Sequence, residues 1–126
     1  MPIELDTTDA PSFIRITLRG SWPTIQEQRE ARERAIAAGH LTQETRALID
    51  FRELSSIANY TEVEKIITAA MQAGGIPLYR AYVVGSAVQF GLVRQMKAIA
   101  PPLVDLEVFT NEADALIWLW RNERKA

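Results

Sequence analysis

The segment that most constrains the fold covers residues 46–61. It contains an unbroken apolar run, Ala-Leu-Ile at 47–49, which Asp50 closes. A short apolar run of this kind favours a strand that is covered on both faces, as in a parallel sheet with helices above and below it. We therefore predict a central strand over residues 46–51. The polar residues that follow then lie at the carboxyl end of the sheet, where open α/β domains usually bind a ligand or partner.

Two short strands are expected before this segment, over residues 3–6 and 12–19. In the second, Ile14, Ile16 and Leu18 alternate with polar residues, which is the period of a strand with one face in water. The polar connection between the two strands allows a turn. We therefore predict an antiparallel hairpin near one edge of the sheet.

A mostly polar helix is predicted from residue 24 to residue 38, where Gly39 ends it. Its apolar surface is a narrow stripe of Ala31, Ala35 and Ala38, so we expect it to pack shallowly. Arg29, Arg32 and Arg34 are interleaved with glutamates, and this pattern favours a solvated helix face over a nucleic-acid site.

A helix and then a strand-and-helix unit follow the central segment. Thr61 and Glu64 have the spacing of a capping box, which predicts a helix from Thr61 to about residue 73. A strand over 79–84 then leads to a helix from Ser86 to about residue 100, and Ser86 and Gln89 have the spacing of a second capping box.

The helix after Ser86 carries apolar residues on two sides. Val88, Leu92, Met96 and Ile99 share one side, which we assign to the core, and Phe90 lies roughly opposite Val88. Phe90 is therefore a candidate for contact with a partner.

A last strand over 104–108 alternates apolar residues with acidic ones, a pattern that discourages further pairing at a sheet edge. A fourth helix begins at 110–112. On it Trp118 and Trp120 point about 200° apart. We expect one tryptophan to face the core and the other to meet something else.

The composition narrows the functional classes. A chain of 126 residues with 48% hydrophobic residues is expected to form a single domain, residues 1–126. A formal charge of −2 disfavours nucleic acid and anionic membranes as partners, and the lack of cysteine excludes disulfides and thiolate chemistry. No signal-peptide pattern or apolar run long enough for a membrane span is visible, so a cytoplasmic location is expected.

The order of these elements, with its central Leu-Ile-Asp-Phe strand, resembles the STAS domains of anti-sigma-factor antagonists. The closing segment 107–119, Glu-Val-Phe-Thr-Asn-Glu-Ala-Asp-Ala-Leu-Ile-Trp-Leu, is similar to the end of a related bacterial family called SpoIIAA-like. The resemblance implies an α/β fold with a mixed sheet of about five strands, a hairpin followed by parallel βαβ units, and four helices. It also implies regulation through a protein partner, or binding of an apolar ligand as in other members of the wider superfamily.

STAS domains are switched by phosphorylation of a serine at the start of the helix after the central strand. That position falls near Asn59, with Tyr60 and Thr61 beside it. The Asp-Ser-Ser-Gly pattern of the switchable members is missing here. Thr61 is therefore a phosphorylation candidate on position alone, and capping of the helix is an alternative role for it.

Several polar residues are candidates for binding. Asp50, Arg52 and Glu53 could contact a ligand or partner, or could form an ion pair that holds the chain. Ser86 could bind an anion or cap its helix. His40, the one histidine, has neither a triad nor a metal-ligand spacing beside it, so we expect no catalytic residues, metal or cofactor.

Two functional hypotheses remain. The first is a non-catalytic STAS-like regulatory or protein-interaction module, forming a homodimer. The second is a carrier or sensor of a small apolar or amphipathic ligand, held between the sheet and the shallowly packed first helix. An enzyme that uses Asp50 and Ser86 ranks below both, because no residue that would activate a nucleophile is visible.

Overall fold

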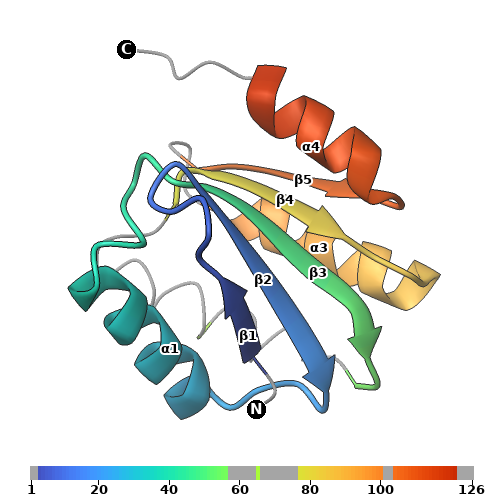
Figure 1. Ribbon diagram of the computed structural model, residues 1–126. Coiled ribbons are helices and arrows are strands. Elements are labelled where there is room, and N and C mark those ends of the chain that lie inside the picture. Colours follow the sequence, from blue (N-terminus) through green and yellow to red (C-terminus); the bar gives the residue numbers. More distant parts are fainter. Residues whose placement is uncertain (1–2, 57–64, 66–76, 101–103, 122–126) are drawn as a thin grey trace.

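A five-stranded sheet forms the centre of the computed structural model, which describes residues 3–56, 65, 77–100 and 104–121 (Figure 1). The strands follow one another across the sheet in chain order. They are β1 (Ile3–Asp6), β2 (Phe13–Gly20), β3 (Arg46–Leu54), β4 (Tyr79–Val83) and β5 (Asp105–Phe109). β1 pairs antiparallel with β2, and every later pairing is parallel. This confirms the hairpin, the central position of β3 and the edge position of β5.

Three helices lie in the described part of the chain: α1 (Ile25–Ala37), α3 (Ala87–Ile99) and α4 (Glu112–Arg121). α4 covers one face of the sheet, and α1 and α3 lie on the other side (Figure 1). The helix predicted from Thr61 to about residue 73, with the capping box of Thr61 and Glu64, lies outside the described residues except for residue 65.

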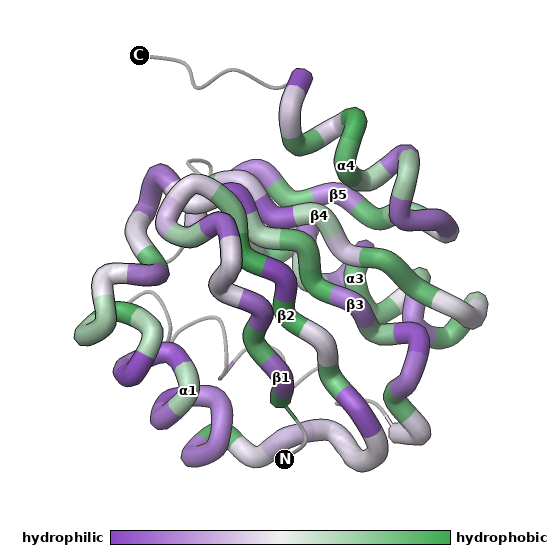
Figure 2. The backbone as a smooth tube through the Cα atoms, in the orientation of Figure 1, coloured by the Kyte–Doolittle hydropathy of each residue, from purple (hydrophilic) through white to green (hydrophobic). Residues whose placement is uncertain are grey.

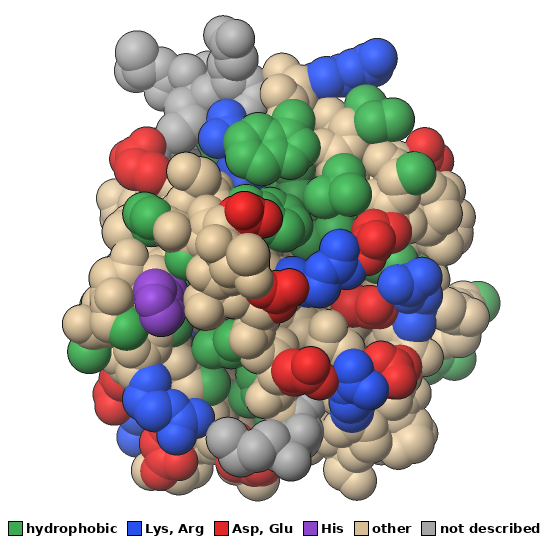
Figure 3. Space-filling view, viewed as in Figure 1, with side chains coloured by type: hydrophobic (Ala, Val, Ile, Leu, Met, Phe, Trp, Pro, Cys, Tyr) green, Lys and Arg blue, Asp and Glu red, His purple; other side chains and the backbone are tan. Residues whose placement is uncertain are grey.

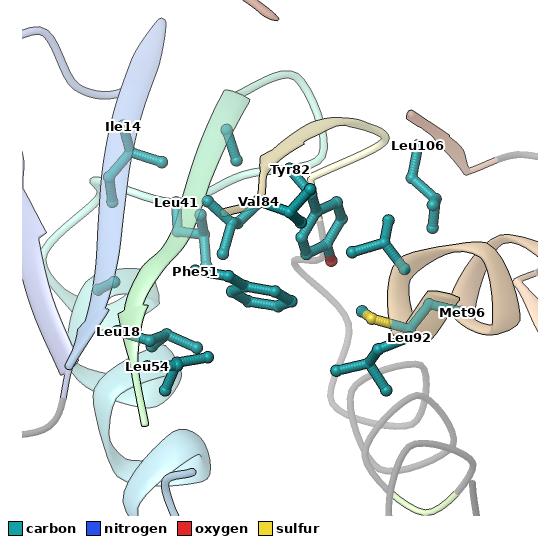
Figure 4. Close-up of a cluster of buried hydrophobic side chains, with 14 residues drawn as sticks. Ile14, Leu18, Leu41, Phe51, Leu54, Tyr82, Val84, Leu92, Met96 and Leu106 are labelled. Carbon is teal, nitrogen blue, oxygen red and sulfur yellow. The ribbon is translucent and has the colours of Figure 1, made fainter. Parts of the chain in front are cut away.

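The side chains of β3 alternate between two hydrophobic clusters. Ala47, Ile49 and Phe51 belong to the larger cluster with α1 and α3, whereas Leu48 belongs to the cluster under α4. The prediction that this strand is buried on both faces is therefore confirmed, and Figure 4 shows part of the larger cluster. The strand also runs three residues beyond the predicted end, to Leu54.

The residues by which β3 exceeds its predicted length include Arg52 and Glu53, which form ion pairs within the sheet. Glu53 pairs in register with Arg19 of β2, and their side chains form an ion pair at 3.2 Å. Arg52 forms hydrogen bonds with Asp50 in the same strand. These charged residues therefore remain in the sheet and do not form the loop that the sequence suggested.

α1 carries a larger share of hydrophilic residues than α4, as the tube in Figure 2 shows. The hydroxyl of Thr24 accepts a hydrogen bond from the amide of Glu27, and the Glu27 carboxylate accepts one from the Thr24 amide, both at 3.0 Å. Ala31 and Ala35 are buried, as the alanine stripe predicted. Ala38 is exposed because it caps the helix end just before Gly39, which has a φ of +76°.

The core-facing side of α3 differs from the predicted one. Gln89, Leu92, Val93 and Met96 are buried, whereas Val88 is 64% exposed. The assignment of Val88 to the core is therefore wrong. The helix is rotated because the polar Gln89 side chain points inward, and Phe90, next to it, is partly buried against the larger cluster.

On α4 the two tryptophans separate as predicted. Trp118 packs beside Tyr79 and Phe109, with ring centroids 6.5 and 5.9 Å away. Trp120 is 52% exposed, and the Arg46 guanidinium lies 4.8 Å from its ring centroid. One tryptophan therefore belongs to the core of the α4 face, and the other lies on the surface.

Candidate functional site

The first candidate site is the charged cluster around Asp50. Its carboxylate accepts two hydrogen bonds from the Arg52 guanidinium, at 3.0 and 2.8 Å, and a third from the Arg52 backbone amide at 2.9 Å. Asp50 itself is buried. Burial alone would raise the pKa of Asp50, but the hydrogen bonds from Arg52 outweigh it and the pKa is lowered. The carboxylate is thus held in its charged form.

Two residues that the sequence did not single out complete this cluster. Arg15 of β2 forms a hydrogen-bonded ion pair with Glu112 at the start of α4. This contact lowers the pKa of Glu112, and the Glu112 carboxylate also lies 3.9 Å from the Arg52 guanidinium. The cluster therefore ties together β2, β3 and the first turn of α4.

Each charge in this cluster faces an opposite charge, and Figure 3 shows acidic and basic side chains alternating in a band below the apolar patch at α4. Such a network can hold elements in place, and it offers no activated nucleophile or base. The ion-pair interpretation of Asp50 and Arg52 is confirmed. Their role in binding a partner stays a prediction.

Ser86 caps α3. Its hydroxyl accepts a hydrogen bond from the Gln89 amide at 3.1 Å. The Gln89 side chain does not return to Ser86. Its carbonyl oxygen accepts from the Gly85 amide and its amide nitrogen donates to the Phe51 carbonyl, both at 2.8 Å. Gln89 therefore fastens α3 to the central strand, a role that the sequence gave no reason to expect.

Three of the predicted site residues, Asn59, Tyr60 and Thr61, lie outside the described residues. Phe90 packs partly against the core, and its use by a partner stays a prediction.

No group of acidic or histidine side chains in the described ranges could hold a metal ion. Within those same ranges, none of the helices has the length and apolar character needed to cross a membrane.

The second candidate site is a cavity of about 140 Å³ between the sheet and α1. Its walls are mainly apolar and come from β1, β2, β3 and α1, with further residues from the connecting segments, β4 and α3. The lining residues in the described part of the chain are Ile3, Leu5, Ile14, Ile16, Leu18, Trp22, Gln28, Ala31, Arg32, Ala35, Leu41, Ala47, Ile49, Phe51, Pro77, Arg80, Tyr82 and Met96. A dry cavity of about 150 Å³ is large enough to take up benzene.

Four of the residues that line this cavity each have a buried polar atom that lacks a hydrogen-bond partner. These atoms are the indole nitrogen of Trp22, the Nε atoms of Arg32 and Arg80, and the hydroxyl of Tyr82. Buried polar atoms are nearly always paired, so each exception requires an explanation. Among the described residues these four are all the unpaired buried side-chain atoms, and all four belong to residues that line one cavity.

Aromatic contacts connect part of this wall. Phe51 lies edge-to-face with both Trp22 and Tyr82, at centroid distances of 5.4 and 5.3 Å. Phe51 and Tyr82 are both visible in Figure 4. The Arg80 guanidinium lies 5.5 Å from the Tyr82 ring centroid. Burial raises the pKa of the Tyr82 hydroxyl, which therefore stays protonated and able to donate.

The prediction that the arginines of this helix lie on a solvated face is wrong for Arg32. Arg32 is partly buried, whereas Arg29 and Arg34 on the same helix are exposed. Burial lowers the pKa of the Arg32 guanidinium; Glu33 opposes this effect, and the positive charges of Arg29 and Arg80 add to it. The helical position of Arg32, next to Ala31 and Ala35, was the available signal.

Together the sheet order, the N-terminal hairpin and the parallel crossovers define a SpoIIAA-like α/β fold. The chain is similar to the crystal structure of an uncharacterised protein of the DUF3478 family, with a SpoIIAA-like fold, from Shewanella loihica PV-4. The two share 19% sequence identity, and the match has a TM-score of 0.65 and covers 93% of this chain and 91% of the other. No family model matches the sequence, and neither does any curated protein.

This similarity confirms the predicted SpoIIAA-like fold. At 19% identity it concerns the fold alone, and the neighbour is itself uncharacterised. The function must therefore be argued from the residues of this chain.

Proposed function

We propose that the chain is a non-catalytic binding protein that carries or senses a small amphipathic molecule in the cavity between α1 and the sheet. The observation that supports this most strongly is the composition of the cavity wall. The wall is apolar over most of its area, and four of its residues have a buried polar atom without a partner. Apolar pockets with a few convergent polar groups are typical of small-molecule sites.

The way α1 packs supports the same proposal. Only Ala31 and Ala35 of this helix are buried in the described structure. Because alanine side chains are short, they leave space above Ile14 and Ile16 that larger residues would fill. A ligand in this space would contact both the helix and the sheet, and its binding would be coupled to the position of α1.

Titration calorimetry with octanoate, an eight-carbon amphipathic probe, tests the proposal. We expect saturable binding to the wild-type protein. Ala31→Leu places a larger side chain in the cavity and should weaken binding at least tenfold. Ala37→Leu, on the exposed side of the same helix, is the matched control and should bind as the wild type does.

Two results would contradict the proposal. One is a protein that binds neither octanoate nor a neutral analogue such as octanol. The other is binding that Ala31→Leu and Ala37→Leu weaken equally, since the probe would then bind away from the cavity.

A second candidate function is interaction with a second copy of the chain through α4. Ile117 and Trp120 are about half exposed on this helix, and the Phe13 ring lies 6.2 Å from that of Trp120. Exposed tryptophans are enriched among the residues that dominate protein interfaces. Light scattering over a range of protein concentrations tests this, because a strictly monomeric mass at high concentration would exclude the dimer.

A further inference from the structure

The chemistry of the unpaired atoms defines what kind of ligand the cavity takes. The indole N–H of Trp22 and the Nε–H groups of Arg32 and Arg80 can only donate hydrogen bonds. The Tyr82 hydroxyl can donate as well. The group that would satisfy these atoms must therefore be a hydrogen-bond acceptor, and a purely hydrocarbon ligand would leave all of them unpaired.

The charged residues that line the cavity further limit the chemical class of the ligand. Among the described residues, neither Arg32 nor Arg80 forms a salt bridge, although each lines the cavity. The nearest acidic influence on Arg32 comes from Glu33, its neighbour along the helix, and Arg80 is close enough to act on Arg32 as a like charge. Two guanidinium groups that repel each other beside an apolar space are stabilised by an anion between them.

We propose that the ligand is an amphipathic anion, whose charged oxygens are bound by Arg32 of α1 and Arg80 of β4 and whose apolar part lies against Ile14, Ile16 and Phe51. This rests on the proposed function and adds the chemical class of the ligand. The anionic group is a carboxylate or a phosphate monoester, since both accept hydrogen bonds from guanidinium groups. Tyr82 lies beside Arg80 and supplies a further donor at the same part of the wall.

The space available limits the size of the ligand. A cavity of about 140 Å³ holds a short alkyl chain or a single aromatic ring within the described walls. The inference therefore concerns short or medium-length acids and phosphate esters.

Calorimetry with three probes of equal chain length tests this inference: octanoate, octyl phosphate and octanol. Hydrogen bonds to charged groups contribute about 1.5–3 kcal/mol, so at least one anion should bind roughly 10- to 100-fold more tightly than the alcohol. Tighter binding of octanoate would identify carboxylic acids as the ligand class, and tighter binding of octyl phosphate would identify phosphate esters.

Variants of the two arginines provide the second part of the test. Arg32→Gln and Arg80→Gln should each weaken binding of the preferred anion at least tenfold and leave octanol binding within twofold of the wild type. Arg29→Gln, an exposed arginine on α1, is the matched control and should change neither. Thermal unfolding of each variant without ligand checks that it folds.

The outcomes separate the two proposals. If octanol binds as tightly as both anions, and the arginine variants have no effect, the anionic class is wrong while the cavity remains a binding site. If none of the three probes binds, the proposed function and the inference both fail.

Discussion

Replacing Ala31 by leucine tests whether the space beside α1 is a true cavity. The side chain of Ala31 is buried on the cavity wall. Leucine adds about three methylene equivalents, and burial of each contributes about 0.8 kcal/mol, so a side chain that fits the cavity would stabilise the protein by up to about 2.4 kcal/mol. The helix propensities of alanine and leucine differ little, so this difference should not obscure the effect.

If the space beside Ala31 were already filled, Ala31→Leu would instead destabilise the protein. Forcing extra methylenes into a filled core typically costs about 1–3 kcal/mol. The free energy of unfolding of Ala31→Leu therefore distinguishes the two cases by direction and not only by size. Ala37→Leu, on the exposed face of α1, should stay within about 0.5 kcal/mol of the wild type.

Equilibrium unfolding in urea is the assay. With a slope of about 1–3 kcal/mol per molar urea, a stabilisation near 2 kcal/mol raises the midpoint by about 1 M. A midpoint that falls below that of the wild type, while Ala37→Leu is unchanged, would show that no usable space exists beside Ala31 and would refute the reasoning.

Three further predictions concern the other contacts. Asp50→Asn should lower the free energy of unfolding by about 1.5–3 kcal/mol, because hydrogen bonds to a charged partner are lost. Since the folded pKa of Asp50 is lowered, the wild type should lose this extra stability as the pH falls below about 4, and acid titration of both proteins checks it. Gln89→Ala should cost about 1–3 kcal/mol by urea unfolding, since it leaves two backbone groups unpaired, whereas Gln95→Ala on the exposed side of α3 should change little. Trp120→Ala should abolish concentration-dependent dimerisation in light scattering, whereas Val88→Ala, at another exposed apolar residue, should leave it intact.

The sequence was sufficient to predict the order and type of the described elements. The continuous apolar run at 47–49 predicted a strand buried on both faces, and the alternation in 12–19 predicted the strand β2. The expectation of a wet face on β2 is wrong at Thr17, which is buried, and at Phe13, which packs in the cluster under α4. Both signals are strong because burial of apolar side chains is the largest local constraint on a strand. The predicted SpoIIAA-like fold is confirmed by the similar solved structure.

What the sequence could not predict depends on pairing between distant residues. Gln89 is buried because Phe51 and Gly85 supply its partners, and neither is apparent from the helical pattern of α3. The cavity likewise requires Arg32 and Arg80 to line the same space, although they come from a helix and a strand far apart in the sequence. Propensity and periodicity report local preferences, and they cannot identify a polar residue that is buried by tertiary contacts.

The location of a bound probe tests the central claim most directly. Octanoate, added to protein with labelled methyl groups, should give intermolecular nuclear Overhauser effects to Ile14, Ile16 and Leu18, which line the cavity. Effects confined to the exposed methyl groups of Val88 and Ile117, or no effects at saturating probe, would contradict the claim that the space between α1 and the sheet is a binding site.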